Sequence, residues 1–380
     1  KMDKYSEIRP YGDDEIRPVL DRLIGNPEFL SAIASFYSPR LARTFPALMR
    51  RAARHKLKGQ LHGVHDVETM QHVIASYMDK MIEDTTTKLT HSGLENLEDG
   101  KSYLFISNHR DITMDPAFVN YMLYHAGHTT LQIAIGDNLL KKPFVSDLMR
   151  LNKSFIVKRS HKGRELLQSL ILLSEYIHHC IDTGQNVWIA QREGRAKDGI
   201  DKTDPTLLKM LAMAERKQGL SVSLGKLHIV PVSISYEYDA CDVLKAEELH
   251  AIETQGSFTK TDRTDIHSIV TGMIGVKGQV HIAFGTELVV NSDDPEVIAT
   301  DIDTQILQNY RLRDINFLAL EKLQQDGLPL QTKLVTAIEA AEINERSRAA
   351  FEQRLQRVDS KLHKYYLYSY ANPVMSFYSA

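Results

Sequence analysis

The sequence predicts an α/β fold, with a mixed, mostly parallel sheet flanked by helices and with helical extensions at both ends. Two observations carry this prediction. Short apolar runs rich in β-branched residues, typical of buried strands, recur through the middle of the 380-residue chain. Longer stretches between them repeat their apolar residues at helical spacing. Strands that alternate with helices imply right-handed crossovers and a mostly parallel sheet.

Taken in order, the predicted strands are four apolar runs, each followed by polar or charged residues, and a fifth run that closes the region. Between them, residues 117–123 form a predicted helix that opens at Asp115-Pro116, and residues 164–181 form a longer one. The predicted strands cover residues 103–106, 154–157, 186–190, 228–236 and 279–284.

Three regions follow from these patterns. We expect residues 1–88 to form a helical N-terminal region, residues 89–290 the α/β domain, and residues 291–380 a helical C-terminal region. Helix-breaking prolines divide the first region into short helices. The aromatic tail, residues 365–378, is expected to dock on the core, and contact with a membrane is the alternative.

Reactive or charged side chains follow three of the predicted strands. They are His109 after the first strand, Lys158 and Arg159 after the second, and Glu193, Gly194, Arg195 and Lys197 after the third. In open α/β sheets, ligands bind outside the carboxyl ends of the strands. A base and two cationic clusters are therefore predicted to converge at one edge, which indicates an anionic substrate whose hydroxyl is activated.

His109 and Asp115 are the candidate catalytic pair. Histidine has an ordinary pKa of about 6.5, so it can accept a hydroxyl proton near neutral pH. A carboxylate on the other ring nitrogen fixes the tautomer and stabilises the imidazolium. Asp111 is an alternative partner. The simpler alternative is that Asp115 only caps a helix beside an incidental histidine.

Four segments, in this order, resemble the four motifs of the glycerophosphate acyltransferase superfamily, which contains glycerol-3-phosphate and 1-acylglycerol-3-phosphate O-acyltransferases. Residues 108–115 match the first motif, Asn-His followed by an aspartate, with one extra residue between His109 and Asp115. Residues 156–159, 193–199 and 230–234 match the other three, the third with one deletion. The flanking residues are most similar to bacterial glycerol-3-phosphate acyltransferases.

The resemblance implies an O-acyltransferase of phospholipid biosynthesis, with residues 89–290 as its catalytic domain. It implies transfer of a fatty acyl group from a thioester, acyl-CoA or acyl carrier protein, to a hydroxyl of glycerol 3-phosphate or a lysophospholipid. His109 would act as general base together with Asp115. The hydroxyl would attack the thioester directly, without a serine or cysteine nucleophile.

The substrate-binding residues are expected around this pair. Lys158, Arg159, Arg195 and Lys197 would supply cations for the phosphate of the acceptor. Gly194 would let the backbone approach that phosphate. Glu193 would contact the glycerol hydroxyl or orient an arginine. By resemblance, Pro231 would shape the acyl side of the pocket.

Two alternatives stay open. The acceptor could be another hydroxylated lipid, such as a lyso-aminolipid, and the cations would then meet a different anion. The protein could also be a non-catalytic relative that binds lipid or thioester, for which the longer His–Asp spacing is the support.

Composition favours an intracellular protein. The net charge of −3 gives no general case for nucleic acid, and two cysteines give no disulfide framework. No histidine cluster matches a metal site and no glycine-rich phosphate loop occurs, so we expect neither metal nor cofactor.

The N-terminal region carries a basic, acid-free segment. No acidic residue occurs between Phe29 and His65, and Thr44 is expected to cap a helix over residues 44–58 with Phe45 and Leu48 on its apolar face. No run of about 18 apolar residues is present. These features predict a cytoplasmic protein that binds peripherally to the anionic inner face of the cell membrane. An ordinary helix packed on the catalytic domain is the alternative.

Overall fold

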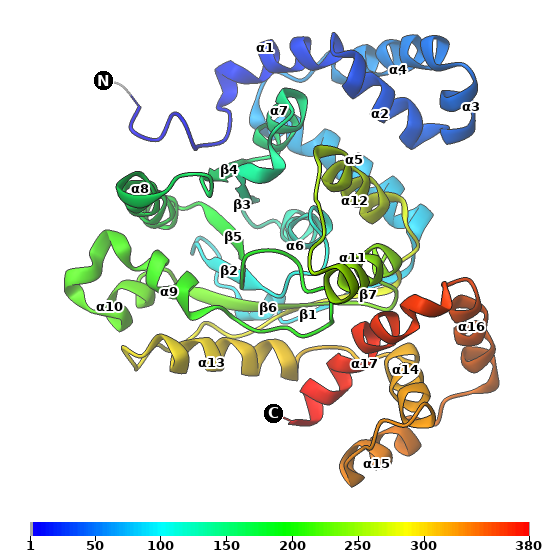
Figure 1. Ribbon diagram of the computed structural model, residues 1–380. Helices are drawn as coiled ribbons and strands as arrows, with labels where there is room; N and C mark the ends of the chain where they lie inside the picture. Colours follow the sequence, from blue (N-terminus) through cyan, green and yellow to red (C-terminus); the bar gives the residue numbers. More distant parts are fainter. Residues whose placement is uncertain (1–2, 380) are drawn as a thin grey trace.

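The structure, a computed structural model, describes residues 3–379 and places a mixed sheet between layers of helices (Figure 1). Within these residues the sheet has seven strands in the order β1-β7-β6-β2-β5-β3-β4. The neighbouring strands from β6 to β4 run parallel, whereas β7 is antiparallel to β6 and parallel to β1. The predicted fold class is confirmed. The strands are β1 (Thr86–Ser92), β2 (Leu104–Ser107), β3 (Leu131–Gly136), β4 (Ser154–Val157), β5 (Asn186–Ala190), β6 (Ile229–Tyr236) and β7 (Gly278–Phe284).

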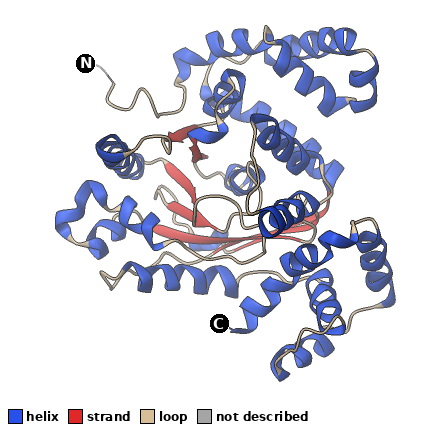
Figure 2. Cartoon of the chain, in the orientation of Figure 1, coloured by secondary structure: helices blue, strands red, loops and turns tan. Residues whose placement is uncertain are grey.

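Helices precede, connect and follow these strands (Figure 2). Before the sheet lie α1 (Asp13–Ile24), α2 (Pro27–Tyr37), α3 (Pro39–Thr44), α4 (Pro46–Leu61) and α5 (Val67–Thr85). Between strands lie α6 (Met114–His125), α7 (Pro143–Leu151), α8 (Gly163–Asp182), α9 (Pro205–Leu211), α10 (Leu220–Gly225), α11 (Asp242–Gln255) and α12 (Asp262–Ile274). After the sheet lie α13 (Pro295–Gln308), α14 (Asp314–Gln325), α15 (Thr332–Ala340), α16 (Glu345–Gln356) and α17 (His363–Ser379).

Side chains that alternate along the strands form a core on each face of the sheet. Leu104 and Ile106 of β2 pack with residues of α8, α9 and α13 on one face. Phe105, between them, packs with residues of α5 and α6 on the other face. Because both faces of β2 are covered, the strand is wholly buried, and the chain reaches the sheet edge only after Ser107.

Two strands escaped the sequence prediction. β1 begins at Thr86, inside the region expected to be helical, and within residues 3–379 it pairs only with β7. Its run of polar residues has no apolar pattern, because an edge strand needs little burial. β3 was missed although Leu131, Ile133 and Ile135 alternate with less buried residues.

The expected Thr44 cap is wrong. Thr44 ends α3, and its hydroxyl donates to the carbonyl of Arg40 at 3.0 Å. Pro39 and Pro46 each begin a helix, so the chain forms two helices separated by Phe45. The tail docks on the core as expected, because α17 packs against α14 and α11 and buries Tyr366 and Tyr370.

Candidate active site

His109 and Asp115 are joined by a hydrogen bond just beyond the end of β2. The Nδ1 of His109 lies 2.7 Å from Oδ2 of Asp115, which stands in the first turn of α6. Asp111, the alternative partner, instead accepts the backbone N–H groups of Thr113 and Met114 with its Oδ1, at 3.2 and 2.9 Å. Asp111 therefore holds the turn just before α6, whose N-cap is Thr113, and Asp115 is the carboxylate that contacts the histidine.

The carboxylate of Asp115 is completely buried and surrounded by donors. Besides His109, its Oδ2 accepts the backbone N–H groups of Arg110 at 2.7 Å and Asp111 at 3.0 Å. Its Oδ1 accepts the hydroxyl of Tyr236 at 2.7 Å. Burial and the charge of Asp115 raise the pKa of Tyr236 well above its usual value, so the phenol stays a donor. Four donors compensate the desolvation of the carboxylate.

The imidazole of His109 keeps one nitrogen available. Its ring packs edge-on against Trp188 of β5, with ring centres 5.7 Å apart, and its side chain remains 14% exposed. Among residues 3–379, Nε2 has no hydrogen-bond partner. With Nδ1 protonated against Asp115, Nε2 carries the lone pair that can accept a proton.

The loop that carries this pair is anchored on both sides. The side-chain amide of Asn108 accepts from the backbone N–H of Ile234 at 2.8 Å and donates to its carbonyl at 2.9 Å. The guanidinium of Arg110 binds both oxygens of Asp201, at 3.0 and 2.7 Å. Burial opposes the charge of Arg110, but Asp201 and Tyr310 outweigh it and raise the pKa of the guanidinium.

The loops after β4 and β5 contact each other through a predicted pair of site residues. The Arg159 guanidinium lies 3.0 Å from the carboxylate of Glu193. Asp137, after β3, accepts the backbone N–H of Arg159 at 3.0 Å and so fixes its loop. Lys158 instead donates to Glu7 of the N-terminal segment, at 2.5 Å.

Arg195 lies beside the histidine. The N–H of Ala196, its neighbour, donates to the carbonyl of His109 at 2.8 Å. The Arg195 side chain is buried, and within the described residues its Nη1 has no hydrogen-bond partner. Gly194, just before it, has a φ of +76°, a conformation that glycine adopts without strain. A buried, unpartnered N–H of a guanidinium favours an anion at this place.

Lys197 belongs to a cluster of charges at the same loop. Its Nζ and that of Lys260 lie 3.6 and 3.4 Å from the same carboxylate oxygen of Glu248. Burial lowers the pKa of Lys197 to about 8; Glu248 opposes this change, and the charges of Lys260 and Arg195 add to it. One carboxylate thus faces two lysines, and the cluster keeps an excess of positive charge.

Pro231 lies inside the buried strand β6, in register with Ile106 of β2, and its carbonyl accepts the N–H of Gly285 at 2.8 Å. The structure places it in the sheet interior.

Sequence reasoning assigned no role to Asn108, Arg110, Asp201 or Tyr236. Tyr236 could have been found, because it shares a strand face with Ile234 and a buried phenol needs a polar partner.

Part of the chain is similar to known acyltransferases. Residues 88–235 match the model of the Acyltransferase family. The glycerol-3-phosphate acyltransferase of Haemophilus ducreyi (strain 35000HP / ATCC 700724) is 27% identical over 194 residues, covering 51% of this chain and 22% of that protein. The one of Pseudomonas fluorescens (strain Pf0-1) is 29% identical over 200 residues, covering 52% and 22%.

A longer match reaches the glycerol-3-phosphate acyltransferase of Glaesserella parasuis serovar 5 (strain SH0165), 23% identical over 290 residues, covering 76% of this chain and 34% of that protein. The chain thus spans between 22% and 34% of the length of these curated relatives. Among solved structures, the 1-acyl-sn-glycerophosphate (LPA) acyltransferase PlsC of Thermotoga maritima is 14% identical, with a TM-score of 0.35, over 84% of this chain and 100% of that one.

The segment that matches the Acyltransferase family runs from within β1 into β6 and holds the His109–Asp115 pair and the loops of Arg159 and Arg195. Four motifs in order and relatives named glycerol-3-phosphate acyltransferase make this segment similar to the glycerophosphate acyltransferase superfamily.

Proposed function

We propose that the protein is an O-acyltransferase that moves a fatty acyl group from a thioester to a hydroxyl of glycerol 3-phosphate or a lysophospholipid. The observation that carries the proposal is the 2.7 Å bond between His109 and a fully buried Asp115, with Nε2 of the histidine free of partners in residues 3–379. This is the arrangement that a general base requires.

The reaction follows from that arrangement. Nε2 of His109 accepts the proton of the acceptor hydroxyl while its oxygen attacks the thioester carbonyl. Asp115 stabilises the imidazolium through Nδ1. The tetrahedral intermediate then breaks its C–S bond, the new ester remains, and the proton moves from His109 to the leaving thiolate. No covalent acyl-enzyme is required.

The acceptor phosphate binds at the cations beside His109. Arg195 is the central contact, because its Nη1 is buried without a partner and its loop is bonded to the His109 carbonyl. Lys197 and Lys260 add positive charge from the Glu248 cluster. Arg159 is held by Glu193 in the structure and adds a further cation when the phosphate replaces that carboxylate as its partner. The negative charge of a dianionic phosphate would balance the excess positive charge of these side chains.

A donor and acceptor screen tests the proposal. The purified protein is given acyl-CoA or acyl carrier protein as donor, with glycerol 3-phosphate, lysophosphatidate or a lyso-aminolipid as acceptor. We expect ester formation with a phosphate-bearing acceptor from at least one donor. Transfer only to a lyso-aminolipid would move the proposal to that acceptor, and no transfer from either donor would refute it.

We further propose that the protein works at the anionic inner face of the cell membrane, as a cytoplasmic, peripheral protein. No helix within residues 3–379 combines the length and apolarity of a membrane span. Three apolar side chains around the junction of α3 and α4 are exposed: Leu41 (51%), Phe45 (54%) and Leu48 (64%). Arg40, Arg43, Arg51 and Arg54 are exposed on the same two helices. Apolar groups beside cations, in an acid-free segment, favour an anionic lipid surface.

Vesicle co-sedimentation tests this second proposal. Each cation near an anionic surface contributes about 1 kcal/mol, so Arg51→Glu with Arg54→Glu should weaken binding at low salt by about 10- to 100-fold. The control reverses two exposed cations at the other end of the chain, Lys333→Glu with Arg346→Glu. Equal pelleting of both variants with phosphatidylglycerol vesicles would contradict the assignment of α3 and α4.

A further inference from the structure

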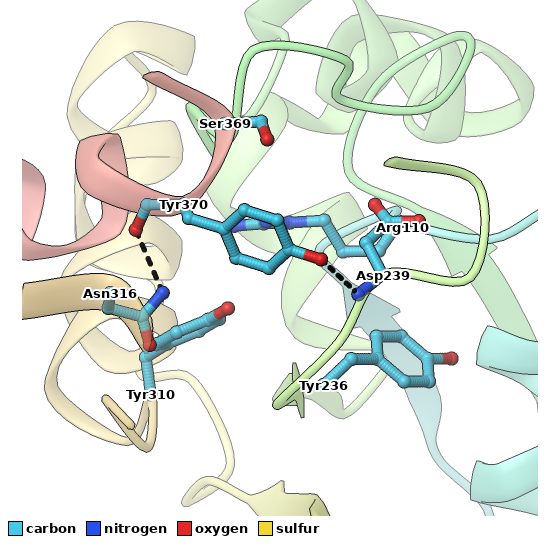
Figure 3. Close-up of a pocket in the computed structure, with 7 residues that line it drawn as sticks. All are labelled: Arg110, Tyr236, Asp239, Tyr310, Asn316, Ser369 and Tyr370. Carbon is cyan, nitrogen blue, oxygen red and sulfur yellow. Dashed lines mark hydrogen bonds between the residues drawn. The ribbon is translucent and has the colours of Figure 1, made fainter. Parts of the chain in front are cut away.

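The C-terminal helix α17 contacts the loop that carries the His109–Asp115 pair, although it lies far outside the segment that matches the family. Figure 3 shows Ser369 and Tyr370 of α17 around a cavity of about 10 Å³ whose other walls include Arg110 and Tyr236. Arg110 directly follows His109, and Tyr236 donates to Asp115. The helix therefore lies one layer of side chains behind the pair.

A first chain of contacts runs from Tyr370 to the backbone of Arg110. The hydroxyl of Tyr370 donates to the carboxylate of Asp242 at 2.7 Å and accepts the N–H of Asp239 at 2.9 Å. The carboxylate of Asp239 pairs with the buried ammonium group of Lys245. That ammonium donates to the carbonyl of Arg110 at 2.5 Å. Tyr370 thus fixes the turn that positions Lys245 under the loop.

A second chain of contacts runs from the middle of α17 to the Arg110 side chain. Pro373 has no N–H, so it removes the helical donor to the carbonyl of Ser369. Gly199 lies against this carbonyl with a φ of +78°, and a Cβ there would stand 2.1 Å from the Ser369 oxygen. Asn372 donates to the carbonyl of Asp198 at 2.7 Å. The carbonyl of Gly199 in turn accepts from the Arg110 guanidinium at 3.2 Å.

We propose that α17 positions the His109–Asp115 pair and that Tyr370 is a positioning residue for the reaction. Both chains of contacts end on Arg110, whose N–H donates to Asp115 at 2.7 Å. The loop has one residue more than the family spacing, and an extra residue adds conformational freedom that must be restrained. Anchoring Arg110 through both its side chain and its carbonyl supplies the restraint. The catalytic consequence rests on the proposed acyl transfer, whereas the ordering of the loop does not.

Hydrogen exchange tests the ordering without any assay of activity. Tyr370→Phe deletes the hydroxyl that binds Asp239 and Asp242. The matched control, Tyr365→Phe, deletes a phenol of the same helix that donates to Glu253 of α11. In peptides that cover residues 107–116, Tyr370→Phe should speed amide exchange at least about threefold, because open forms of the loop become more populated, and the control should not. Unchanged exchange in this segment would overturn the proposal.

Kinetics test the consequence for the reaction. Tyr370→Phe should lower kcat about 5- to 30-fold, with the KM of donor and acceptor within about twofold, because positioning acts on the chemical step. In a His109→Ala background, which lacks the positioned base, the same change should cost less than about twofold in the residual rate, since it acts through the pair. Equal losses in both backgrounds would mean a merely structural role. Asn372→Ala removes a donor of the second chain of contacts and should also lower kcat and speed exchange in the loop. It replaces Tyr370→Phe as the test if that variant does not fold.

Hydrogen exchange and kinetics together distinguish the proposed acyl transfer from the proposed role of α17. Faster exchange in Tyr370→Phe, combined with a wild-type protein that transfers no acyl group, would refute the proposed function and leave the ordering of the loop by α17 standing. Normal acyl transfer with unchanged exchange and unchanged kcat in Tyr370→Phe would refute the role of α17 alone.

Discussion

Replacing Asp115 by asparagine removes a charge and keeps the shape of the side chain. Three donors, from His109, Arg110 and Asp111, converge on Oδ2, so the amide oxygen takes that position and the NH2 group faces the Tyr236 hydroxyl, which can accept. The histidine therefore keeps its tautomer and loses only the neighbouring charge. At an effective dielectric of about 20, a charge about 4 Å from the imidazolium contributes about 4 kcal/mol, or about 10³-fold in rate.

The measurement is kcat for acyl transfer by Asp115→Asn and by Asp111→Asn, with circular dichroism to verify folding. Asp111 holds the turn before α6 through its Oδ1, and an asparagine oxygen can accept the same two backbone N–H groups, so Asp111→Asn should stay within about threefold of wild type. A larger loss in Asp111→Asn than in Asp115→Asn would refute the pairing of His109 with Asp115. A loss below about tenfold in Asp115→Asn would refute the electrostatic role.

Two further predictions concern the anion site and the sheet. Arg195→Ala should raise the acceptor KM at least about tenfold and leave the donor KM unchanged, because its free Nη1 is the proposed phosphate contact; equal rises in both would contradict the assignment. Burial and the charges of Arg311 and Arg313 lower the pKa of His281 to about 4, so the unfolded chain binds the proton first. Stability should therefore fall as pH drops from about 6.5 to about 4, by about 2 kcal/mol at pH 5. Urea unfolding at pH 7 and pH 5 measures this decrease in the free energy of unfolding, and the contribution of about 2 kcal/mol from His281 should be absent in His281→Gln.

The central part of the fold could be predicted because its strands are buried on both faces. Short apolar runs such as those of β2 and β6, placed between helical patterns, are typical of strands buried on both faces. The His109–Asp115 pair was also predictable, since a strand end and a helix start place the two residues close together in sequence. The choice between Asp115 and Asp111 needed the observed loop, because only its path decides which carboxylate turns toward the ring.

The residues that support the pair could not be predicted from local pattern. Asp201 and Lys245 bind Arg110 from positions distant in the sequence, and Tyr370 acts on it through Asp239. Each is a buried polar residue whose partner is set by tertiary packing. The pattern of apolar residues in α17 does not indicate that this helix docks behind the loop of residues 107–116. The expected cap at Thr44 was wrong for a local reason: Thr44 is the last residue of α3, and α4 begins at Pro46 after Phe45.

The most direct test of the central claim is the rate of acyl transfer by His109→Ala, measured beside wild type with the donor and acceptor that the screen identifies. Loss of the general base should lower kcat by about 10²- to 10⁴-fold, while the circular dichroism spectrum and thermal midpoint stay close to wild type. A folded His109→Ala protein that turns over at nearly the wild-type rate would contradict the assignment of His109 as the base.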